Sequence, residues 1–213
     1  MHFIPENLDR YCCDMSENEP ALLHQLYRET YQKVLQPRML SGHFQGRLLS
    51  LLSKLLRPKY ILEIGTYTGY SALCLAEGLR PDGQLITIDK NEELEPLVNK
   101  YFGLSGFGHQ LEFKIGKAID IIPNLEFQPD LVFIDADKSA YQQYFDLVID
   151  RMPSGGVILA DNVLWSGKVV EALDPKDLDT AALLAFNAHI QRDPRVENVL
   201  MPIRDGLQLI RKK

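Results

Sequence analysis

The sequence predicts an α/β fold in which helices pack against a mostly parallel sheet. From residue 60 onward, short β-rich runs alternate with amphipathic stretches of helical length, an alternation typical of parallel strands joined by right-handed crossovers. A glycine-containing turn joins the first run to the first of these helical stretches. The last two runs have only residues 202–206 between them, a spacing that suits a hairpin and predicts an antiparallel edge of the sheet.

Two helices are expected ahead of the sheet, followed by seven strands with helices between them. Apolar residues recur at helical spacing in residues 20–35 and 44–56, and Gln36-Pro37-Arg38 separates the two stretches because proline interrupts helical hydrogen bonding. The runs that we expect to form strands are residues 60–64, 84–88, 111–115, 131–134, 157–160, 196–201 and 207–211. The helical patterns between them are residues 71–79, 92–102, 118–122, 140–151 and 178–192.

Composition and charge limit the class of protein. The 213 residues, 46% of them hydrophobic and 24% charged, are enough for a single soluble domain over residues 1–213, with the N-terminal helices (about 18–56) on or near its active site. The net charge of −6 and the lack of a basic stripe argue against nucleic acid as a substrate. No apolar run approaches the roughly 18 residues of a membrane span, so we expect no membrane partner. The N-terminal segment MHFIPENLDRY lacks the layout of a signal peptide.

The three cysteines predict a cytoplasmic location. Cys12 and Cys13 are adjacent, and Cys74 lies in the helix after the glycine turn. An odd count without a repeated spacing argues against a disulfide framework or a zinc site. We therefore expect three free thiols in a reducing cytoplasm.

The stretch ILEIGTYTGYS, residues 61–71, carries the strongest functional signal. An apolar strand that contains Glu63 is followed by Gly65 and Gly69, and a helix begins at Ser71. A strand, a glycine turn and a helix start let the backbone approach a nucleotide-like ligand closely. The spacing Glu-x-Gly-x-x-x-Gly differs from the G-x-G-x-x-G of dinucleotide binders, so it favours S-adenosylmethionine (SAM) over NAD. The alternative is an ordinary tight turn between a strand and a helix.

Asp89 follows the second strand, 24 residues after Gly65 (89 − 65). This is close to the offset of about 20 residues at which an acid holds ribose hydroxyl groups in this topology. A carboxylate can accept hydrogen bonds from both the 2′ and the 3′ hydroxyl, so we favour a ribose contact. The alternative is that Asp89 caps the helix that starts at Asn91.

Acidic and amide side chains follow two further strands. FIDADK places Asp135 and Asp137 after one of them, and LADNVLW places Asp161 and Asn162 after the other. Neighbouring strand ends lie about 5 Å apart, so Asp135, Asp161 and Asn162 can share one hard cation, whereas Asp137 is expected to point away and cap a helix. Three oxygen ligands suit Mg²⁺, with Mn²⁺ or Ca²⁺ as alternatives, and do not suit zinc. The alternative is that each acid only caps a helix or is a solvent-exposed charge in a loop.

Three more residues are candidates for roles at this site. Lys138 follows Asp135 by three residues, and a desolvated pocket near a divalent cation favours the neutral amine that a general base requires. The alternative is a surface lysine at a helix start. His43 in MLSGHFQG is a second candidate base, although such a histidine is more often a turn or core residue. Trp165 follows Asn162 by three residues and would line the substrate pocket, unless it only packs in the core or a loop.

The order of GTYTGYS, ITIDK, GKA, FIDADK and ADNVLW makes the chain resemble the metal-dependent O-methyltransferases of small molecules. This family includes catechol and caffeoyl-CoA enzymes and many bacterial relatives. The resemblance covers about residues 38–211. It implies a Rossmann-like SAM-methyltransferase fold, with a seven-stranded mostly parallel sheet, an antiparallel last strand and helices on both faces.

The resemblance also implies roles for the residues at matching motif positions. The cation would be held by Asp135, Asp161 and Asn162, and Lys138 would be the catalytic base with Asp135 beside it. SAM would contact Ser41, Glu63, Gly65, Tyr67, Ser71, Asp89, Gly116, Ala118 and Asp135.

The resulting hypothesis is methyl transfer from SAM to one hydroxyl of a catechol-like acceptor whose two oxygens chelate the cation. One alternative is an Mg²⁺-dependent phosphotransferase, which the absence of a phosphate loop weakens. The other is a non-catalytic SAM-binding domain, which needs neither cation ligands nor Lys138. Before Pro37 the chain is shorter than the plant caffeoyl-CoA enzymes, so a CoA thioester acceptor is unsupported. Family resemblance also implies a homodimer.

Overall fold

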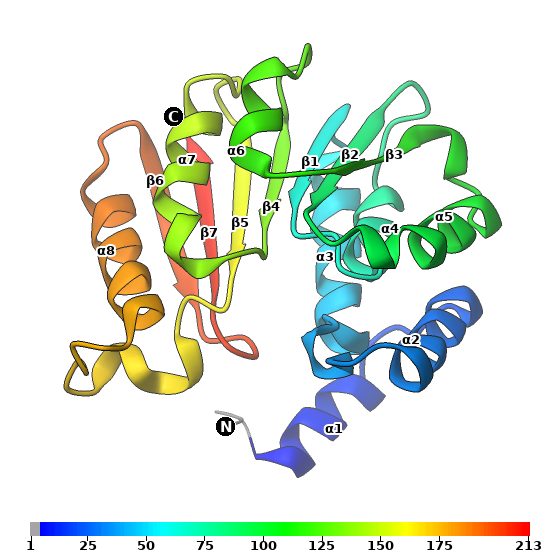
Figure 1. Cartoon of the computed structure of the whole chain (residues 1–213), viewed down its shortest axis with the longest axis horizontal. Helices are drawn as coiled ribbons and strands as arrows, with labels where there is room; N and C mark the ends of the chain where they lie inside the picture. Colours follow the sequence, from blue (N-terminus) through cyan, green and yellow to red (C-terminus); the bar gives the residue numbers. More distant parts are fainter. Residues whose placement is uncertain (1–4) are drawn as a thin grey trace.

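The computed structural model describes residues 5–213, in which seven strands form one sheet (Figure 1). The strands are β1 (Tyr60–Ile64), β2 (Gln84–Asp89), β3 (Leu111–Ile115), β4 (Leu131–Ile134), β5 (Val157–Asp161), β6 (Val196–Met201) and β7 (Leu207–Lys212). Their order is β3-β2-β1-β4-β5-β7-β6, and β7 runs antiparallel to both of its neighbours while the other pairs are parallel. The predicted sheet is therefore confirmed, and its strand boundaries agree with the prediction to within one residue.

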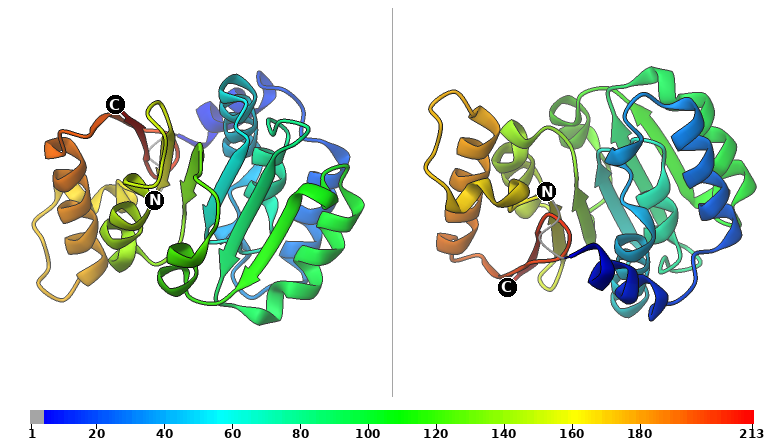
Figure 2. Two further views of the ribbon diagram at one scale, coloured as in Figure 1. Left: turned by 90° about the horizontal axis from the view of Figure 1, so that it is seen from above. Right: turned by 90° about the horizontal axis from the view of Figure 1, so that it is seen from below.

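Helices cover both faces of the sheet, as predicted (Figures 1 and 2). They are α1 (Glu6–Asp14), α2 (Ala21–Lys33), α3 (Gly42–Leu56), α4 (Tyr70–Ala76), α5 (Glu95–Leu104), α6 (Ala118–Ile121), α7 (Tyr141–Ile149) and α8 (Leu178–Arg192). One hydrophobic core packs the helices from α2 through α5 against one face of the sheet, through residues such as Leu26, Leu49 and Phe133. A second hydrophobic core packs the helices from α6 through α8 against the other face of the sheet, through residues such as Ile134 and Phe145. Because both faces are covered, every residue of β4 and β5 is buried.

The prediction does not include α1, although its ends follow ordinary rules. Pro5 precedes the helix, and Glu6 and Asp9 lie in its first turn, where acidic side chains interact favourably with the helix dipole. None of its residues is buried, although Leu8, Tyr11 and Cys12 recur at helical spacing, so the apolar pattern that could have predicted α1 is present.

α8 has the predicted bounds, whereas α4 and α5 differ from the prediction at a glycine and at a proline. The expected helix over residues 92–102 begins with a 3₁₀ turn, Glu92–Leu94, and α5 starts just before Pro96. α4 ends at Ala76 rather than Leu79. A Cβ on Gly78 would lie 2.1 Å from the carbonyl carbon of Ser53, so the chain after α4 passes very close to the backbone of α3.

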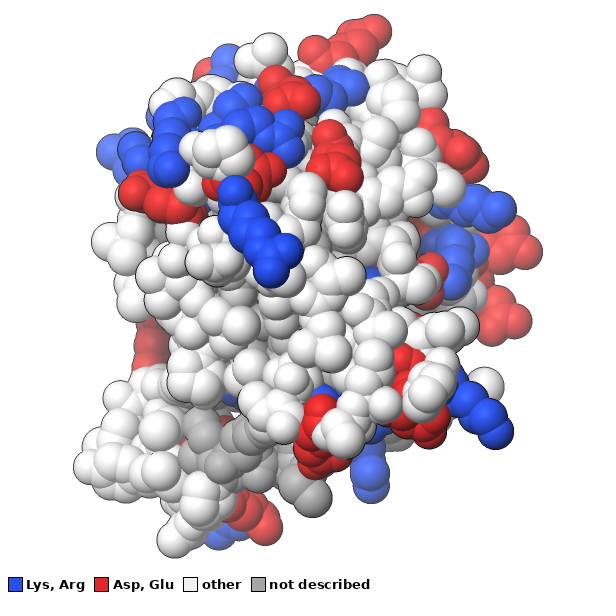
Figure 3. Space-filling model, turned by 90° about the vertical axis from the view of Figure 1, so that its left-hand side faces the viewer, with Lys and Arg blue, Asp and Glu red and all other residues white. Residues whose placement is uncertain are grey.

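The surface that carries α8 and β6 has mixed charge rather than a basic stripe. Figure 3 shows Lys and Arg side chains next to Asp and Glu near the top of this face, with a broad uncharged area below them. Ion pairs on these elements include Arg195 with Asp193 and Arg211 with Glu197, both at 2.7 Å. In residues 5–213, none of the helices has the length and apolar character that crossing a membrane requires.

The strand order reverses at β1, which lies between β2 and β4, and ligands bind at such a switch point in open α/β sheets. Gly65 follows β1 directly, with a φ of 102°. A Cβ added to Gly65 would lie 2.2 Å from the backbone carbonyl oxygen of Asp135. The turns after β1 and β4 therefore meet in backbone contact, which only glycine permits here.

Gly65→Ala should lower the free energy of unfolding by about 3 kcal/mol, because the added methyl group combines a backbone clash with an unfavourable φ. Urea unfolding followed by circular dichroism measures this. Gly103→Ala is the matched control, since Gly103 lies within α5 and a Cβ there meets nothing within 4 Å. The control should raise stability by about 0.5–1 kcal/mol. Equal effects of the two substitutions would contradict the backbone contact.

Candidate active site

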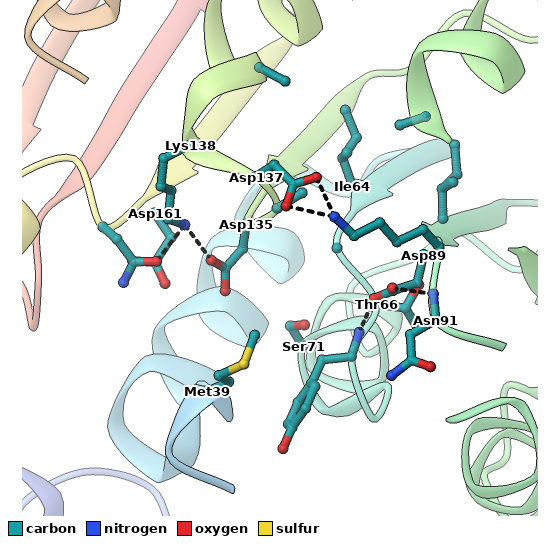
Figure 4. Close-up of a pocket in the computed structure, with 18 of the residues that line it drawn as sticks. Met39, Ile64, Thr66, Ser71, Asp89, Asn91, Asp135, Asp137, Lys138 and Asp161 are labelled. Carbon is teal, nitrogen blue, oxygen red and sulfur yellow. Dashed lines mark hydrogen bonds and ion pairs between the residues drawn. The ribbon is translucent and has the colours of Figure 1, made fainter. Parts of the chain in front are cut away.

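A cavity of about 1050 Å³ opens beyond the carboxyl ends of the parallel strands (Figure 4). The cavity wall includes a residue from the end of each of the five parallel strands, β1 to β5. These residues are Gly65 after β1, Asp89 of β2, Gly116 after β3, Asp135 after β4 and Asn162 after β5. These positions are far apart in the sequence. The parallel sheet brings them to one edge because the carboxyl ends of its strands face the same side.

The segment between α2 and α3 forms another part of the wall. Most of residues 34–41 line the cavity, and Ser41 among them is buried. The Tyr67 hydroxyl donates a hydrogen bond of 2.8 Å to the carbonyl oxygen of Gln36. This bond ties the turn after β1 to the segment between α2 and α3.

Eight of the nine residues expected to contact SAM line the cavity: Ser41, Gly65, Tyr67, Ser71, Asp89, Gly116, Ala118 and Asp135. The Asp89 carboxylate accepts hydrogen bonds from the backbone N–H groups of Tyr67 and Asn91, at 2.8 and 3.0 Å. These bonds fix its orientation and leave lone pairs for further donors. Asn91, not Asp89, caps the following helix, because its side chain accepts from the N–H of Glu93.

Glu63, the ninth residue, does not line the cavity and lies beneath it, which differs from the role that the resemblance implies. It is fully buried, and its Oε2 accepts a hydrogen bond of 2.5 Å from the Thr87 hydroxyl, whereas Oε1 has no partner. Burial raises the pKa of Glu63 to about 8, because desolvation disfavours the carboxylate. The Thr87 hydroxyl in turn bonds to that of Thr66, so Glu63 supports the turn after β1 from below.

The raised pKa of Glu63 predicts that stability falls as pH rises from 4.5 toward about 8. In that window the folded protein keeps a proton that the unfolded chain releases, so this residue alone contributes a slope of up to about 1.4 kcal/mol per pH unit. Glu63→Gln cannot ionise and should lack this contribution. Urea unfolding of both proteins between about pH 5 and pH 8 measures the difference. Parallel pH profiles for the two proteins would contradict it.

Lys138 lies at the centre of the predicted cation site. Its Nζ atom is 3.0 Å from Oδ1 of Asp135 and 2.7 Å from Oδ1 of Asn162, so the oxygens of two predicted ligands reach a common atom. Figure 4 shows Asp135 and Lys138 pointing toward one another across this part of the cavity. Asn162 has a φ of 58°, a left-handed conformation that asparagine adopts more readily than most residues. Lys138 itself is 9% exposed.

Asp161, the third predicted ligand, is 2% exposed and carries one oxygen without a partner. Its Oδ2 accepts a hydrogen bond of 2.7 Å from the side-chain N–H of Gln45, whereas Oδ1 accepts none. Burial and the neighbouring charge of Asp135 raise the pKa of Asp161. A buried carboxylate in this state is destabilised unless positive charge lies close to it.

The donor set fits a hard divalent cation. Two carboxylates and one amide offer only oxygen ligands, which Mg²⁺, Mn²⁺ and Ca²⁺ prefer. Within residues 5–213, no group of three or more His, Cys, Asp or Glu side chains is placed to hold a metal ion; the Asn162 amide would be the third oxygen ligand beside Asp135 and Asp161. The unpartnered Oδ1 of Asp161 and the position that Lys138 Nζ takes between Asp135 and Asn162 both indicate that the site accommodates positive charge.

Tyr141 and Trp165 surround the Lys138 ammonium group. The Tyr141 hydroxyl accepts a hydrogen bond of 2.6 Å from Lys138 and donates one of 2.9 Å to the backbone carbonyl of Asp161. Lys138 Nζ also lies 5.9 Å from the centre of the Trp165 ring, which lines the cavity as expected. Sequence reasoning overlooked Tyr141. Its place three residues after Lys138, at the start of α7, is the signal that could have found it.

Two other residues singled out in the sequence, His43 and Asp137, lie apart from the predicted cation ligands. His43 is the second residue of α3 and is not among the residues that line the cavity; its Nε2 lies 2.7 Å from the carbonyl oxygen of Glu17. Asp137 points away from Asp135, as expected (Figure 4). It forms an ion pair with Lys90 at 2.7 Å instead of a side-chain cap.

Gln45 and Arg204 belong to the site, although the sequence gives no local sign of it. Gln45 contacts Asp161 from α3, and the Nη1 amino group of Arg204 donates to the Gln45 side-chain oxygen and to the backbone carbonyl of Ser41. The two residues are 159 positions apart, so only the folded chain shows that they interact.

Known proteins resemble this chain in sequence and in structure. A family model described as O-methyltransferase matches residues 13–213. Caffeoyl-CoA O-methyltransferase 5 of Nicotiana tabacum is 33% identical over 205 residues, which cover 91% of this chain and 85% of that protein. Tricin synthase 2 of Oryza sativa subsp. japonica is 37% identical over 179 residues, or 79% of this chain. The aligned region spans only 61% of the length of that rice protein.

A solved structure resembles the whole chain. The SAH-bound methyltransferase PaMTH1 of Podospora anserina has a TM-score of 0.89 with this structure at 30% sequence identity, and the match covers 100% of this chain and 98% of that one. The family model and two of these three proteins are thus named for methyl transfer.

Proposed function

The chain belongs to the O-methyltransferase family, and from this premise we propose that it transfers a methyl group from SAM to a hydroxyl of a small, catechol-like acceptor with the help of a divalent cation. SAM-dependent O-methylation follows from the family. The cation and the class of acceptor are the parts that we propose. Membership of this family goes against the phosphotransferase alternative.

One observation carries the proposal. Oxygens of Asp135 and Asn162 lie 3.0 and 2.7 Å from one atom, Lys138 Nζ, and the wall of the same cavity includes the buried Asp161 with its unpartnered Oδ1. A protein that only binds SAM has no need to bring two acids, an amide and a lysine together there. These groups suit an acceptor that presents two adjacent oxygens.

The two groups that the chain would hold supply different chemistry. SAM supplies a methyl group on a sulfonium ion, and a divalent cation supplies a Lewis acid that favours ionisation of the acceptor hydroxyl. We expect Gly65, Ser71 and Asp89 to hold SAM, because they line the cavity at the switch point of the sheet.

Lys138 is the residue that we propose as the general base, with Nζ receiving the proton of the acceptor hydroxyl. The Tyr141 hydroxyl and the Asn162 amide oxygen hold Nζ in place, at 2.6 and 2.7 Å. The Trp165 ring, whose centre is 5.9 Å from Nζ, would cover the same region. Methyl transfer needs little covalent participation by the protein, so positioning and charge compensation would provide most of the catalysis.

An acceptor assay tests this function. The protein is incubated with SAM, Mg²⁺ and a generic catechol, and methyl ether formation is followed by mass spectrometry. A second arm uses a catechol carried on a CoA thioester, because several relatives are named for such a substrate. A monophenol should react much more slowly, since it cannot chelate a cation. Equal turnover of the monophenol, or no turnover of either catechol, would contradict the proposed acceptor class.

The homodimer expected from the sequence remains a prediction. Leu51 and Leu55 on α3, Tyr11 on α1 and Met15 just after α1 are exposed apolar side chains, which such pairing would cover. Size-exclusion chromatography with light scattering measures the mass in solution, and a mass near 24.3 kDa at high protein concentration would contradict a dimer.

A further inference from the structure

Gln45 joins the predicted cation site to the opposite side of the cavity. We propose that Gln45 and Arg204 are positioning residues that hold Asp161 with one oxygen presented to a divalent cation. This inference rests on the proposed metal-dependent function and adds to it a supporting group of residues from α3 and from the loop between β6 and β7. Neither residue has to touch the acceptor or SAM for this role.

The chemistry of the two neighbours fixes the orientation of the Gln45 amide. The Asp161 carboxylate only accepts hydrogen bonds and the Arg204 guanidinium only donates them. The Gln45 N–H group must therefore point to Asp161, at 2.7 Å, and its carbonyl oxygen to Arg204. Gln45 is 2% exposed, so water is a poor substitute for either partner. The amide thus connects an anion to a cation with both of its ends satisfied.

The pairing leaves the two oxygens of Asp161 in different states. Oδ2 is held by Gln45, whereas Oδ1 is buried and has no hydrogen-bond partner. Residues that bind metals through carboxylates are themselves commonly oriented by hydrogen bonds from a surrounding layer of residues. The arrangement therefore matches a carboxylate that is held by one oxygen and offers the other as a ligand.

Arg204 is anchored where it can hold this geometry. The β6–β7 loop is tied to the segment after β5, because the carbonyl oxygens of Asp205 and Gly206 accept hydrogen bonds from the N–H groups of Leu164 and Val163, at 2.9 and 3.2 Å. Arg204 also donates to the backbone carbonyl of Ser41. It therefore links Asp161, through Gln45, to the segment before α3 that lines the cofactor side of the cavity.

The experiment measures cation binding without turnover. Trp165 is the only tryptophan of the chain, and its ring centre lies 5.9 Å from Lys138 Nζ. Paramagnetic Mn²⁺ bound nearby should quench its fluorescence, so a titration gives the Kd. We expect Gln45→Met to raise the Kd for Mn²⁺ by about 10- to 100-fold. The Kd for S-adenosylhomocysteine, measured by calorimetry without metal, should stay within about twofold of wild type.

Arg204→Gln tests the contact at the oxygen of Gln45 separately from the contact at its N–H group. It should also weaken Mn²⁺ binding, because Gln45 loses the partner that holds its oxygen. Unlike Gln45→Met, it should weaken S-adenosylhomocysteine binding as well, since the contact with Ser41 is lost. Gln208→Met is the matched control: Gln208 is 1% exposed, pairs in register with Ala160 and faces the core on the other side of the sheet. Its Mn²⁺ affinity should equal that of wild type.

The outcomes distinguish this inference from the proposed function. If wild type binds no Mn²⁺, both fail. If wild type binds Mn²⁺ and both Gln45→Met and Arg204→Gln keep its Kd within about twofold, the cation site stands and the positioning role is overturned. A melting scan accompanies each variant. Should Gln45→Met not fold, Arg204→Gln decides, because Arg204 is only partly buried and its replacement leaves the core intact.

Discussion

Lys138→Ala should lower kcat for methyl transfer by about 10²- to 10⁴-fold, the usual contribution of a general base, while SAM binds almost as tightly as before. Lys138 Nζ contacts Asp135, Asn162 and Tyr141 at 3.0, 2.7 and 2.6 Å, so its substitution acts at the proposed acceptor site. The cofactor contacts expected at Gly65 and Asp89 do not involve it. Steady-state kinetics with a catechol and calorimetry with SAM measure the two quantities separately.

A surface lysine provides the control for this substitution. Lys114 on β3 pairs with Glu112 at 2.5 Å, and Lys114→Ala should leave kcat unchanged. Near-normal turnover of Lys138→Ala would show that the base assignment is wrong. A large loss of SAM affinity in that variant would place Lys138 in cofactor binding instead.

Asp135→Asn should reduce turnover and Mn²⁺ affinity by at least about 100-fold, because a cation at this site contributes several kcal/mol of charge stabilisation. The change leaves one carboxylate, Asp161, and two amides, and it also removes the negative partner of Lys138 at 3.0 Å. An excess of chelator should abolish activity in the wild type, and added Mg²⁺ should restore it. Initial rates in chelator, with and without Mg²⁺, give the measurement.

The neighbouring acid makes a close control for Asp135. Asp137 lies two residues away, but its carboxylate pairs with Lys90 at 2.7 Å rather than with the predicted cation ligands. Asp137→Asn should therefore change Mn²⁺ affinity little. Undiminished methylation in excess chelator, or equal effects of the two substitutions, would count against a role for a divalent cation.

The fold could be predicted from sequence because its signals are local. A strand such as β4, LVFI, is apolar along its full length, and the alternation of such runs with helical patterns is enough to indicate a parallel sheet. Most of the residues expected to contact SAM follow from the same logic, since residues after parallel strands meet at one edge of the sheet. α1 was missed although Leu8, Tyr11 and Cys12 recur at helical spacing; the helix is short and none of its residues is buried.

Parts of the site could not be predicted, because they depend on contacts between distant segments. Gln45 is one polar residue within an amphipathic helix, and Arg204 is one basic residue of a hairpin loop. They reach Asp161 and Ser41 across 116 and 163 positions of sequence. His43 shows the reverse case: its residue type suggested a base, and the fold directs it to the carbonyl of Glu17.

The sequence by itself determined the order of the strands and of the helices from α2 onward, the glycine turn and the acids at the ends of β2, β4 and β5, because backbone preference and apolar periodicity act over a few residues. Only the tertiary structure decided which polar side chains face the cavity, which lie beneath it as Glu63 does, and which hold others in place as Gln45 does. Those outcomes depend on how helices from opposite ends of the chain pack on the sheet, since burial and hydrogen-bond pairing exist only once that packing is complete.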